Sequence, residues 1–189
     1  MSLILTPRLS MEPITLEIVE AVMLGRREDA ERLSRAELPP AWPNHGLIER
    51  AFRADLDAIR ANPARRLWGD RVMILRNGPR RVVGSVVFHG APDADGLVEV
   101  GYGVEQDLQR QGYATEATGA AVTWALEQPG VRAVRAVTPS WHVASRRVLE
   151  KLGFTVIGAR DHDMLDLVEY ERLSERLALE SVRLMRAAV

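Results

Sequence analysis

The sequence contains no cysteine. Disulfide bonds, a cysteine nucleophile and thiolate metal sites are therefore excluded. It also contains no run of apolar residues long enough to span a bilayer, and residues 1–10 carry too short an apolar segment for a secretory signal peptide. We therefore expect a cytoplasmic protein with no membrane partner.

Neither sign of charge dominates, because 25 basic residues face 26 acidic ones and the net charge is −1. A global field that attracts nucleic acid is thus excluded, and any anion site must be built locally. Hydrophobic residues make up 47% of the 189 residues, enough to bury one core. We expect one domain over residues 1–172, followed by a helix at 173–189 that packs on it or contributes to a homodimer.

Residues 97–128 are the most informative stretch. Leu97–Val104 is rich in apolar residues and contains two glycines, which predicts a strand that bends or bulges near Gly101 and Gly103. The next segment predicts a helix over residues 113–128, because it lacks proline and repeats a small residue at helical spacing. This narrow stripe consists of Ala114, Ala117, Ala121 and Ala125.

The junction at residues 109–114 lies where a helix has N–H groups without internal acceptors. Gly112 removes a side chain there, and the helix dipole favours negative charge. The junction is therefore a candidate pyrophosphate site. The alternative is an ordinary strand–helix turn in which Gly112 only permits a tight bend.

Periodicity and turn residues place the remaining elements in an α/β fold. Thr15 is a candidate N-cap for the first helix, and Asn44 for a later one. The expected strands cover residues 8–13, 68–76, 82–89, 97–104, 131–138, 154–159 and 165–171. The expected helices cover residues 16–23, 26–35, 48–62, 113–128, 142–152 and 174–188.

The hexapeptide QRQGYA at residues 109–114 resembles the Q/R-x-x-G-x-G/A acyl-CoA signature of the GNAT N-acetyltransferases. Other segments resemble the ribosomal-protein-alanine acetyltransferase branch: TPRL at 6–9, EVGY at 99–102, TEA at 115–117 and SRRVLEKLGF at 145–154. The resemblance implies a mixed, mostly antiparallel sheet, splayed around acyl-CoA and flanked by helices. It also implies direct transfer of acetyl from acetyl-CoA to a primary amine, without a covalent enzyme intermediate.

The resemblance assigns the cofactor site to the strand, the junction and a later helix. The backbone N–H groups of residues 111–114 would bind the pyrophosphate, and the Val104 N–H would polarise the thioester carbonyl. Arg110 either reaches a phosphate or is a solvated surface residue. The implied cofactor-binding residues are Tyr102, Gly103, Val104, Gln109, Arg110, Gln111, Gly112, Tyr113, Ala114, Thr115, His142 and Ser145.

Glu99 is the leading candidate for the general base, because it alternates with Val98 and Val100 and so points to the other face of the strand. The alternative role for Glu99 is that of an edge-strand glutamate paired with an arginine. His89, which closes a strand, is a rival candidate. The resemblance makes Ser145 a candidate proton donor to the cofactor sulfur, whereas a helical serine otherwise bonds back to a carbonyl.

Two residues depart from the family pattern. Leu149 stands where many members carry the tyrosine that protonates the thiolate, so Ser145 or a water must replace it. His142 stands where asparagine is usual. These departures leave a second reading open, a CoA-binding module without catalysis. On this helix we expect Ala144, Val148 and Leu152 to face the core.

The acceptor is either a protein N-terminal α-amine or a small-molecule amine. Trp42 and Phe52 are candidates for the acceptor pocket together with Glu99, with buried packing as the alternative for both aromatic residues. Residues 161–163, Asp-His-Asp, do not predict a metal site. Three consecutive strand residues cannot all face one ion, and no fourth ligand is evident.

Overall fold

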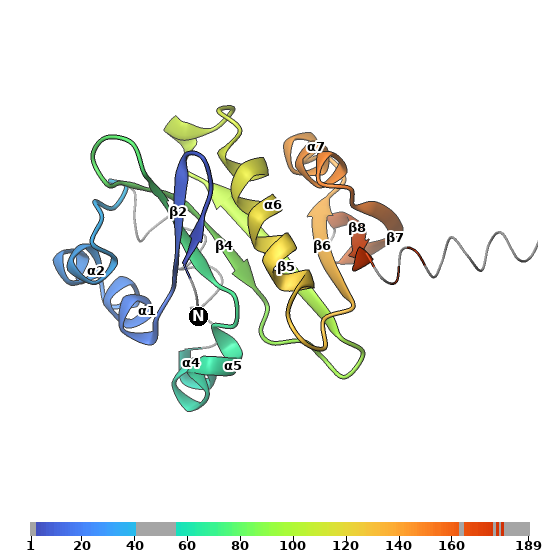
Figure 1. Cartoon of the computed structure of the whole chain (residues 1–189), viewed down its shortest axis with the longest axis horizontal. Coiled ribbons are helices and arrows are strands. Elements are labelled where there is room, and N and C mark those ends of the chain that lie inside the picture. Colours follow the sequence, from blue (N-terminus) through green and yellow to red (C-terminus); the bar gives the residue numbers. More distant parts are fainter. Residues whose placement is uncertain (1–2, 41–55, 163–164, 176, 178, 180–189) are drawn as a thin grey trace, which may run out of the picture. The chain divides into compact units, whose positions relative to one another are not determined.

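The computed structural model describes residues 3–40, 56–162, 165–175, 177 and 179. The chain forms two compact units: Met1–Ala91 with Gly101–Ala121, here called the first unit, and Pro92–Val100 with Val122–Val189, the second unit. Strand β5 (Leu97–Val104) and helix α6 (Tyr113–Leu126) each contribute residues to both (Figure 1).

The strands of the first unit pair in sequence order and antiparallel from β1 to β4. They are β1 (Ile4–Leu5), β2 (Leu9–Pro13), β3 (Arg71–Leu75) and β4 (Val82–Phe88). The predicted strands over residues 8–13, 68–76 and 82–89 are therefore confirmed, although residues 68–70 lie outside β3. Every residue of β4 is buried, including the polar Ser85, as expected of an internal strand that is mostly apolar.

The helices described in the first unit are α1 (Leu16–Met23), α2 (Arg27–Ser34), α4 (Leu56–Ala61), α5 (Pro63–Arg66) and the 3₁₀ turn η2 (Gln106–Leu108). Polar side chains cap two of them, α1 and α5. Thr15 caps α1, as predicted, by accepting a hydrogen bond from the Ile18 N–H at 3.4 Å. Asn62 ends α4 and caps α5, a helical turn that the sequence pattern did not predict. Asn44 lies outside the described residues.

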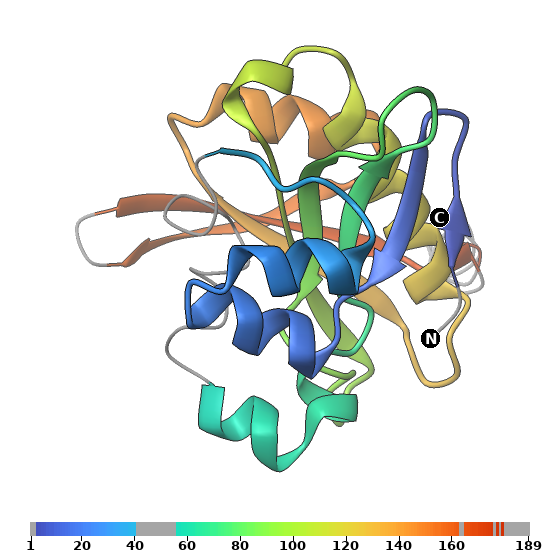
Figure 2. The same cartoon turned by 90° about the vertical axis from the view of Figure 1, so that its left-hand side faces the viewer.

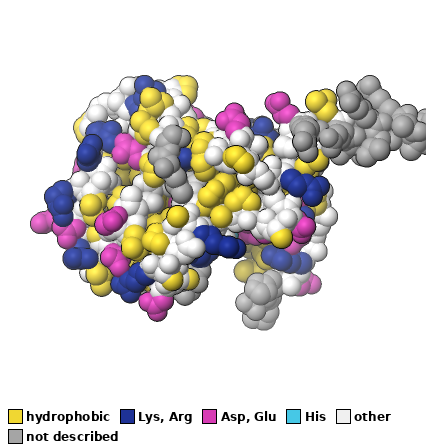
Figure 3. All heavy atoms as spheres, turned by 60° about the horizontal axis from the view of Figure 1, so that its bottom comes forward, with side chains coloured by type: hydrophobic (Ala, Val, Ile, Leu, Met, Phe, Trp, Pro, Cys, Tyr) yellow, Lys and Arg dark blue, Asp and Glu magenta, His cyan; other side chains and the backbone are white. Residues whose placement is uncertain are grey.

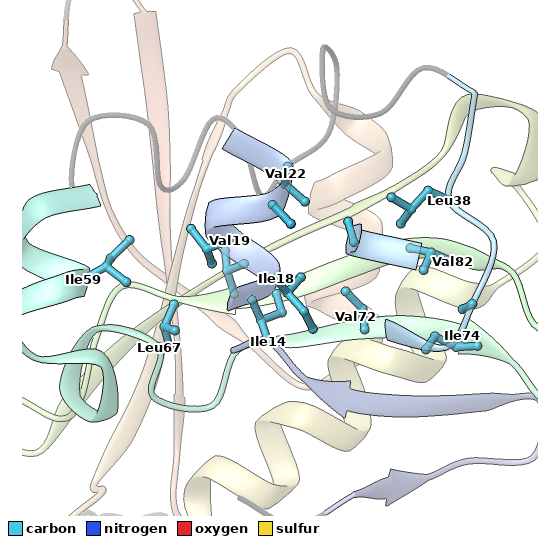
Figure 4. Close-up of a cluster of buried hydrophobic side chains, with 14 residues drawn as sticks. Ile14, Ile18, Val19, Val22, Leu38, Ile59, Leu67, Val72, Ile74 and Val82 are labelled. Carbon is cyan, nitrogen blue, oxygen red and sulfur yellow. The ribbon is translucent and has the colours of Figure 1, made fainter. Parts of the chain in front are cut away.

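Apolar side chains from α1 pack on one face of these strands. Ile18 and Val22 join Val72, Ile74 and Val82 in one buried cluster (Figure 4). The first turns of α6 lie on the opposite side of the strands from α1 and α2 (Figure 2). Ala117 and Ala121 of that helix are fully buried, which confirms the inward-facing alanine stripe.

The second unit joins one parallel strand pair to two antiparallel ones. Residues Leu97 to Glu99 of β5 lie parallel to Ala133 to Arg135 of β6. Strand β8 pairs antiparallel with both β6 and β7. The elements are β6 (Ala133–Pro139), α7 (Val143–Lys151), β7 (Thr155–His162) and β8 (Leu165–Leu173). The result is a mixed, mostly antiparallel sheet flanked by helices, as predicted.

The ends of α7 agree with the sequence pattern, because His142 is its N-cap residue and Gly153 follows it with φ +78°. Most of the predicted C-terminal helix lies outside the described residues. Among those described, no helix has the length and apolar character needed to cross a membrane. Basic and acidic side chains are interspersed over the face in Figure 3, in keeping with the balanced composition.

Asp70 is a carboxylate without solvent exposure, placed just before β3. Its Oδ1 accepts a hydrogen bond from the Phe88 N–H at 2.5 Å, whereas its Oδ2 has no hydrogen-bond partner within the described residues. Burial raises the pKa of Asp70 well above its usual value, and the Phe88 hydrogen bond and the charges of Arg66 and Arg71 oppose this only in part.

This raised pKa predicts a specific pH dependence of stability. A carboxyl that holds its proton more tightly when folded stabilises the protein most below its unfolded pKa, near 3.8, and this contribution falls as pH rises. We expect the free energy of unfolding of Asp70→Asn to decline less between pH 4 and 8 than that of the wild type, with the difference limited to about 1.4 kcal/mol per pH unit.

Urea unfolding at several pH values measures this difference. Asp57→Asn is the matched control, because the Asp57 side chain is fully exposed. Parallel pH profiles for Asp70→Asn and wild type would contradict the assignment.

Candidate functional site

The predicted anion site lies in the first unit, where η2 gives way to α6. Arg110 adopts a left-handed backbone with φ +64°, and Gly112 has φ +85°. Gly112 accepts the first helical hydrogen bond from the Glu116 N–H at 3.0 Å and is thus the N-cap residue. A left-handed conformation is unfavourable for arginine, and such strain often occurs where the backbone is shaped for a ligand.

The N–H groups at this helix start are available to a ligand. Within the described part of the chain, those of Gly112, Tyr113, Ala114 and Thr115 have no hydrogen-bond acceptor. Four donors and the positive end of a helix of 14 residues therefore coincide. This arrangement favours a multiply charged anion such as a diphosphate.

Arg8 holds this junction from a distant part of the sequence. Its Nη1 donates to the Gln111 carbonyl at 2.8 Å, and its Nε donates to the Glu116 carboxylate at 2.6 Å. The guanidinium also lies over the Tyr113 ring, 4.5 Å from its centroid. From the sequence, Arg8 was recognisable only as part of the TPRL segment, and no role was predicted for it.

Glu116 is the acceptor that anchors this contact. Besides the Arg8 side chain, its Oε1 receives the Thr6 hydroxyl at 2.6 Å and the Arg8 N–H at 2.9 Å. Burial acts to raise the pKa of Glu116, but the hydrogen bonds from Thr6 and Arg8 and the charge of Arg8 outweigh it, so the pKa lies below its usual value. Glu116 therefore stays ionised at neutral pH.

The second half of β5, which carries Tyr102, Gly103 and Val104, also belongs to the first unit. The Glu105 N–H bonds the Val83 carbonyl of β4 at 2.9 Å, and the Gln109 side chain donates to the Val104 carbonyl at 3.1 Å. These contacts fix the end of the strand relative to the anion junction. The predicted thioester and diphosphate residues are thus held by one hydrogen-bonded framework.

Gly84 is a second residue whose role was not predictable from the sequence. A Cβ on Gly84 would lie 2.1 Å from the Gly103 carbonyl oxygen and 3.0 Å from the Val104 Cα. Only glycine therefore allows β4 to lie this close to the predicted thioester strand. No sequence motif marks this position, because its meaning depends on a neighbour in space.

Glu99 lies in the second unit and is partly buried, between the buried Val98 and Val100. This confirms the alternation that turns Glu99 to the other face of β5. Arg135 is opposite Glu99 in the register of β5 and β6. The Arg135 Nε donates a hydrogen bond to the Glu171 carboxylate at 2.9 Å. His89, the rival base, lies in the first unit and is exposed.

Ser145 and His142 lie at the start of α7, in the second unit. Ser145 is half-buried, and the His142 Nδ1 is 3.5 Å from the Thr138 hydroxyl. The predicted core stripe of this helix was wrong at Ala144, whereas Val148 and Leu152 are half-buried. Leu149 is buried with 1% exposure, whereas Ala144 is exposed.

This correction has a physical reason, because the two candidate stripes are one residue apart and both contain apolar side chains. Leucine buries much more apolar area than alanine, so the helix turns Leu149 inward and Ala144 outward, while Val148 and Leu152 stay half-buried. Trp42 and Phe52, the predicted acceptor residues, lie outside the described residues. In the described ranges, no group of three or more histidine, aspartate or glutamate side chains is placed to hold a metal ion.

The close approach at Gly84 predicts a stability difference between two glycines. Gly84→Ala should lower the free energy of unfolding by about 1–3 kcal/mol, because the new methyl group collides with backbone. A Cβ on Gly101 would meet Val87 at an ordinary 3.5 Å, so Gly101→Ala should be neutral or raise stability by up to about 1 kcal/mol. Urea unfolding measures both, and equal changes would contradict the prediction.

Comparison with known proteins identifies the family. A family model described as an acetyltransferase (GNAT) domain matches residues 8–155. The chain is 29% identical over 156 residues to the uncharacterized N-acetyltransferase YjdG of Bacillus subtilis (strain 168), which covers 82% of this chain and 90% of that protein.

Solved structures show the same fold. The ribosomal-protein-S5-alanine acetyltransferase of Vibrio fischeri matches with a TM-score of 0.65 and 13% identity, covering 93% of this chain and 98% of that one. RimL, a ribosomal L7/L12 alpha-N-protein acetyltransferase in complex with coenzyme A, matches with a TM-score of 0.60 and 14% identity, covering 91% and 98%. With the family model spanning most of its length, this chain belongs to the GNAT acetyltransferase family.

Proposed function

We propose that this protein transfers an acetyl group from acetyl-CoA to a primary amine by direct attack, without a covalent enzyme intermediate. Family membership supports acyl transfer. RimL, which shares the fold, was solved in complex with coenzyme A, and this supports the choice of donor. The observation that carries the proposal is the row of N–H groups from Gly112 to Thr115 at the start of α6, for which the described residues supply no acceptor.

These donors suit the diphosphate of the cosubstrate, which would place two negative charges against a helix N-terminus. In the proposal, the N–H groups of residues 111–114 bind this diphosphate, together with Gln109 and Thr115 at the edges of the junction. The exposed Arg110 contributes a phosphate contact. Because the donors are backbone groups on a fixed turn, they need little reorganisation when the ligand arrives.

The thioester would lie along the second half of β5. The pantetheine arm pairs with the backbone of Tyr102 and Gly103, and the Val104 N–H donates to the thioester carbonyl. In the reaction, the amine nitrogen bonds to the carbonyl carbon, and the carbon–sulfur bond breaks as the CoA thiolate departs. Alignment of both reactants accounts for a large share of the barrier reduction, typically about 7–11 kcal/mol in intramolecular reactions.

Proton transfers need one base and one acid. We assign the base to Glu99, which removes a proton from the substrate ammonium directly or through water. Leu149 is apolar and buried, so it cannot protonate the thiolate. Ser145 or a water supplies that proton, and His142 donates a hydrogen bond to the pantetheine arm.

We further propose a protein N-terminal α-amine as the acceptor, with a small-molecule amine as the alternative. The TPRL, EVGY, TEA and SRRVLEKLGF segments resemble the ribosomal-protein-alanine acetyltransferase branch. Two proteins of this fold are named as acetyltransferases of ribosomal protein S5 alanine and of ribosomal L7/L12, which agrees with that class. Trp42 and Phe52 stay predictions for the acceptor pocket, and residues 173–189 for the dimer contact.

The proposal predicts acetyl-CoA turnover that depends on Glu99. With a panel of N-terminal peptides and small amines, the wild type should consume acetyl-CoA and bind CoA with micromolar affinity. Glu99→Gln should lower kcat/KM by about 10²–10⁴-fold, because it removes the base and keeps the shape. Its affinity for CoA should remain within about threefold of that of the wild type, since Glu99 is not assigned to the diphosphate.

Thiol release measures turnover, and calorimetry measures CoA affinity. Glu171→Gln is a matched control, because Glu171 is also a strand glutamate of the second unit and pairs with Arg135. Tight CoA binding without turnover on any amine would favour the CoA-binding module instead. A missing calorimetric signal would remove the enzyme proposal altogether.

A further inference from the structure

Arg8 is fixed by contacts on three sides, although it lies in the N-terminal segment, far from α6 in the sequence. One edge of the guanidinium bonds Glu116, a terminal nitrogen bonds the Gln111 carbonyl, and the flat face lies over Tyr113. A planar guanidinium can make these contacts at once, whereas a lysine ammonium cannot. The Arg8 side chain is 42% exposed. Without these contacts a side chain that exposed would be mobile, so the contacts define its position.

The bond to Gln111 has a geometric consequence for the anion site. A trans peptide is planar, so its N–H points away from its carbonyl. When Arg8 draws the Gln111 carbonyl toward itself, the N–H of Gly112 must point to the opposite side. Arg8 thereby sets the direction of one diphosphate donor without touching the diphosphate.

Arg8 also compensates a negative charge next to the site. Glu116 is ionised and lies in the first turn of α6, where a diphosphate would experience its repulsion. The guanidinium 2.6 Å away compensates this charge. Moreover, the Arg8 Nη2 is 3.3 Å from where a Gly112 Cβ would lie, so the turn and the side chain fit closely.

We propose that Arg8 is a positioning residue of the cosubstrate site: it orients the Gln111–Gly112 peptide for the diphosphate and compensates the charge of Glu116. This inference rests on the proposed function, because it assumes that acetyl-CoA occupies the start of α6. A purely structural Arg8 would only tie the segment before β2 to the start of α6. The two roles differ in which part of the cosubstrate is affected when Arg8 is replaced.

The experiment compares acetyl-CoA with S-acetylpantetheine, a truncated donor that carries the thioester but no phosphate. Loss of Arg8 should affect only the donor that has a diphosphate. For Arg8→Met we expect kcat/KM with acetyl-CoA to fall about 10- to 100-fold through KM, the range of a lost charge-assisted hydrogen bond. The kcat/KM of Arg8→Met with S-acetylpantetheine should differ from that of the wild type by less than about threefold.

Two further variants separate geometry from charge. Arg8→Lys keeps the charge but cannot donate to Glu116 and Gln111 at the same time. Its loss of kcat/KM with acetyl-CoA should therefore be intermediate. Adding Glu116→Gln to Arg8→Met removes the uncompensated carboxylate and should restore part, not all, of the affinity for CoA. Arg60→Met is the control, because Arg60 is 45% exposed and bonds Glu20 at 2.7 Å far from the junction in sequence.

The outcomes are distinguishable. A wild-type protein that binds no CoA in calorimetry would overturn the proposed function and this inference with it. Wild-type binding combined with equal losses on both donors in Arg8→Met would overturn the inference alone. Should Arg8→Met fail to fold, Arg8→Lys decides the question, and wild-type behaviour of Arg8→Lys toward both donors would overturn the orienting role.

Discussion

The N–H groups that begin a helix cannot be satisfied by the helix itself, and at α6 this constraint organises the first unit. Gly112 makes the turn that exposes these donors, and its φ of +85° suits glycine rather than other residues. Arg8 then holds the turn from the outside through the Gln111 carbonyl. The helix start is thus shaped both by its own sequence and by a segment about a hundred positions earlier.

Two carboxyl groups of the first unit show how the surroundings of a group determine its pKa. Glu116 receives hydrogen bonds from Thr6 and Arg8, which outweigh burial and keep its pKa low. Asp70 is also buried, but one backbone hydrogen bond and nearby arginines do not offset desolvation, so its pKa is high. The protein therefore keeps Glu116 ionised beside the predicted anion site, whereas the carboxyl group of Asp70, just before β3, holds its proton more tightly than usual.

Much of the fold was predictable because local patterns determine it. Thr15 capped α1, and the alanine stripe of α6 turned inward, since each depends on residues a few positions apart. The buried face of α7 was predicted only in part, because Ala144 and Leu149 belong to adjacent apolar stripes and only packing decides which of the two is buried. The Arg8–Glu116 bond and the approach of Gly84 to Gly103 join residues distant in sequence, and periodicity carries no information about such pairs.

The balance of charge explains why the local framework carries so much of the proposed binding. With a net charge of −1, the protein has no long-range field that would concentrate a polyanionic cosubstrate. Affinity must then come from short-range donors whose directions are set beforehand, because charged groups in solvent contribute little at a distance. An arginine that orients a peptide and cancels a neighbouring carboxylate fits this requirement better than an additional surface charge, since it makes the existing backbone donors effective.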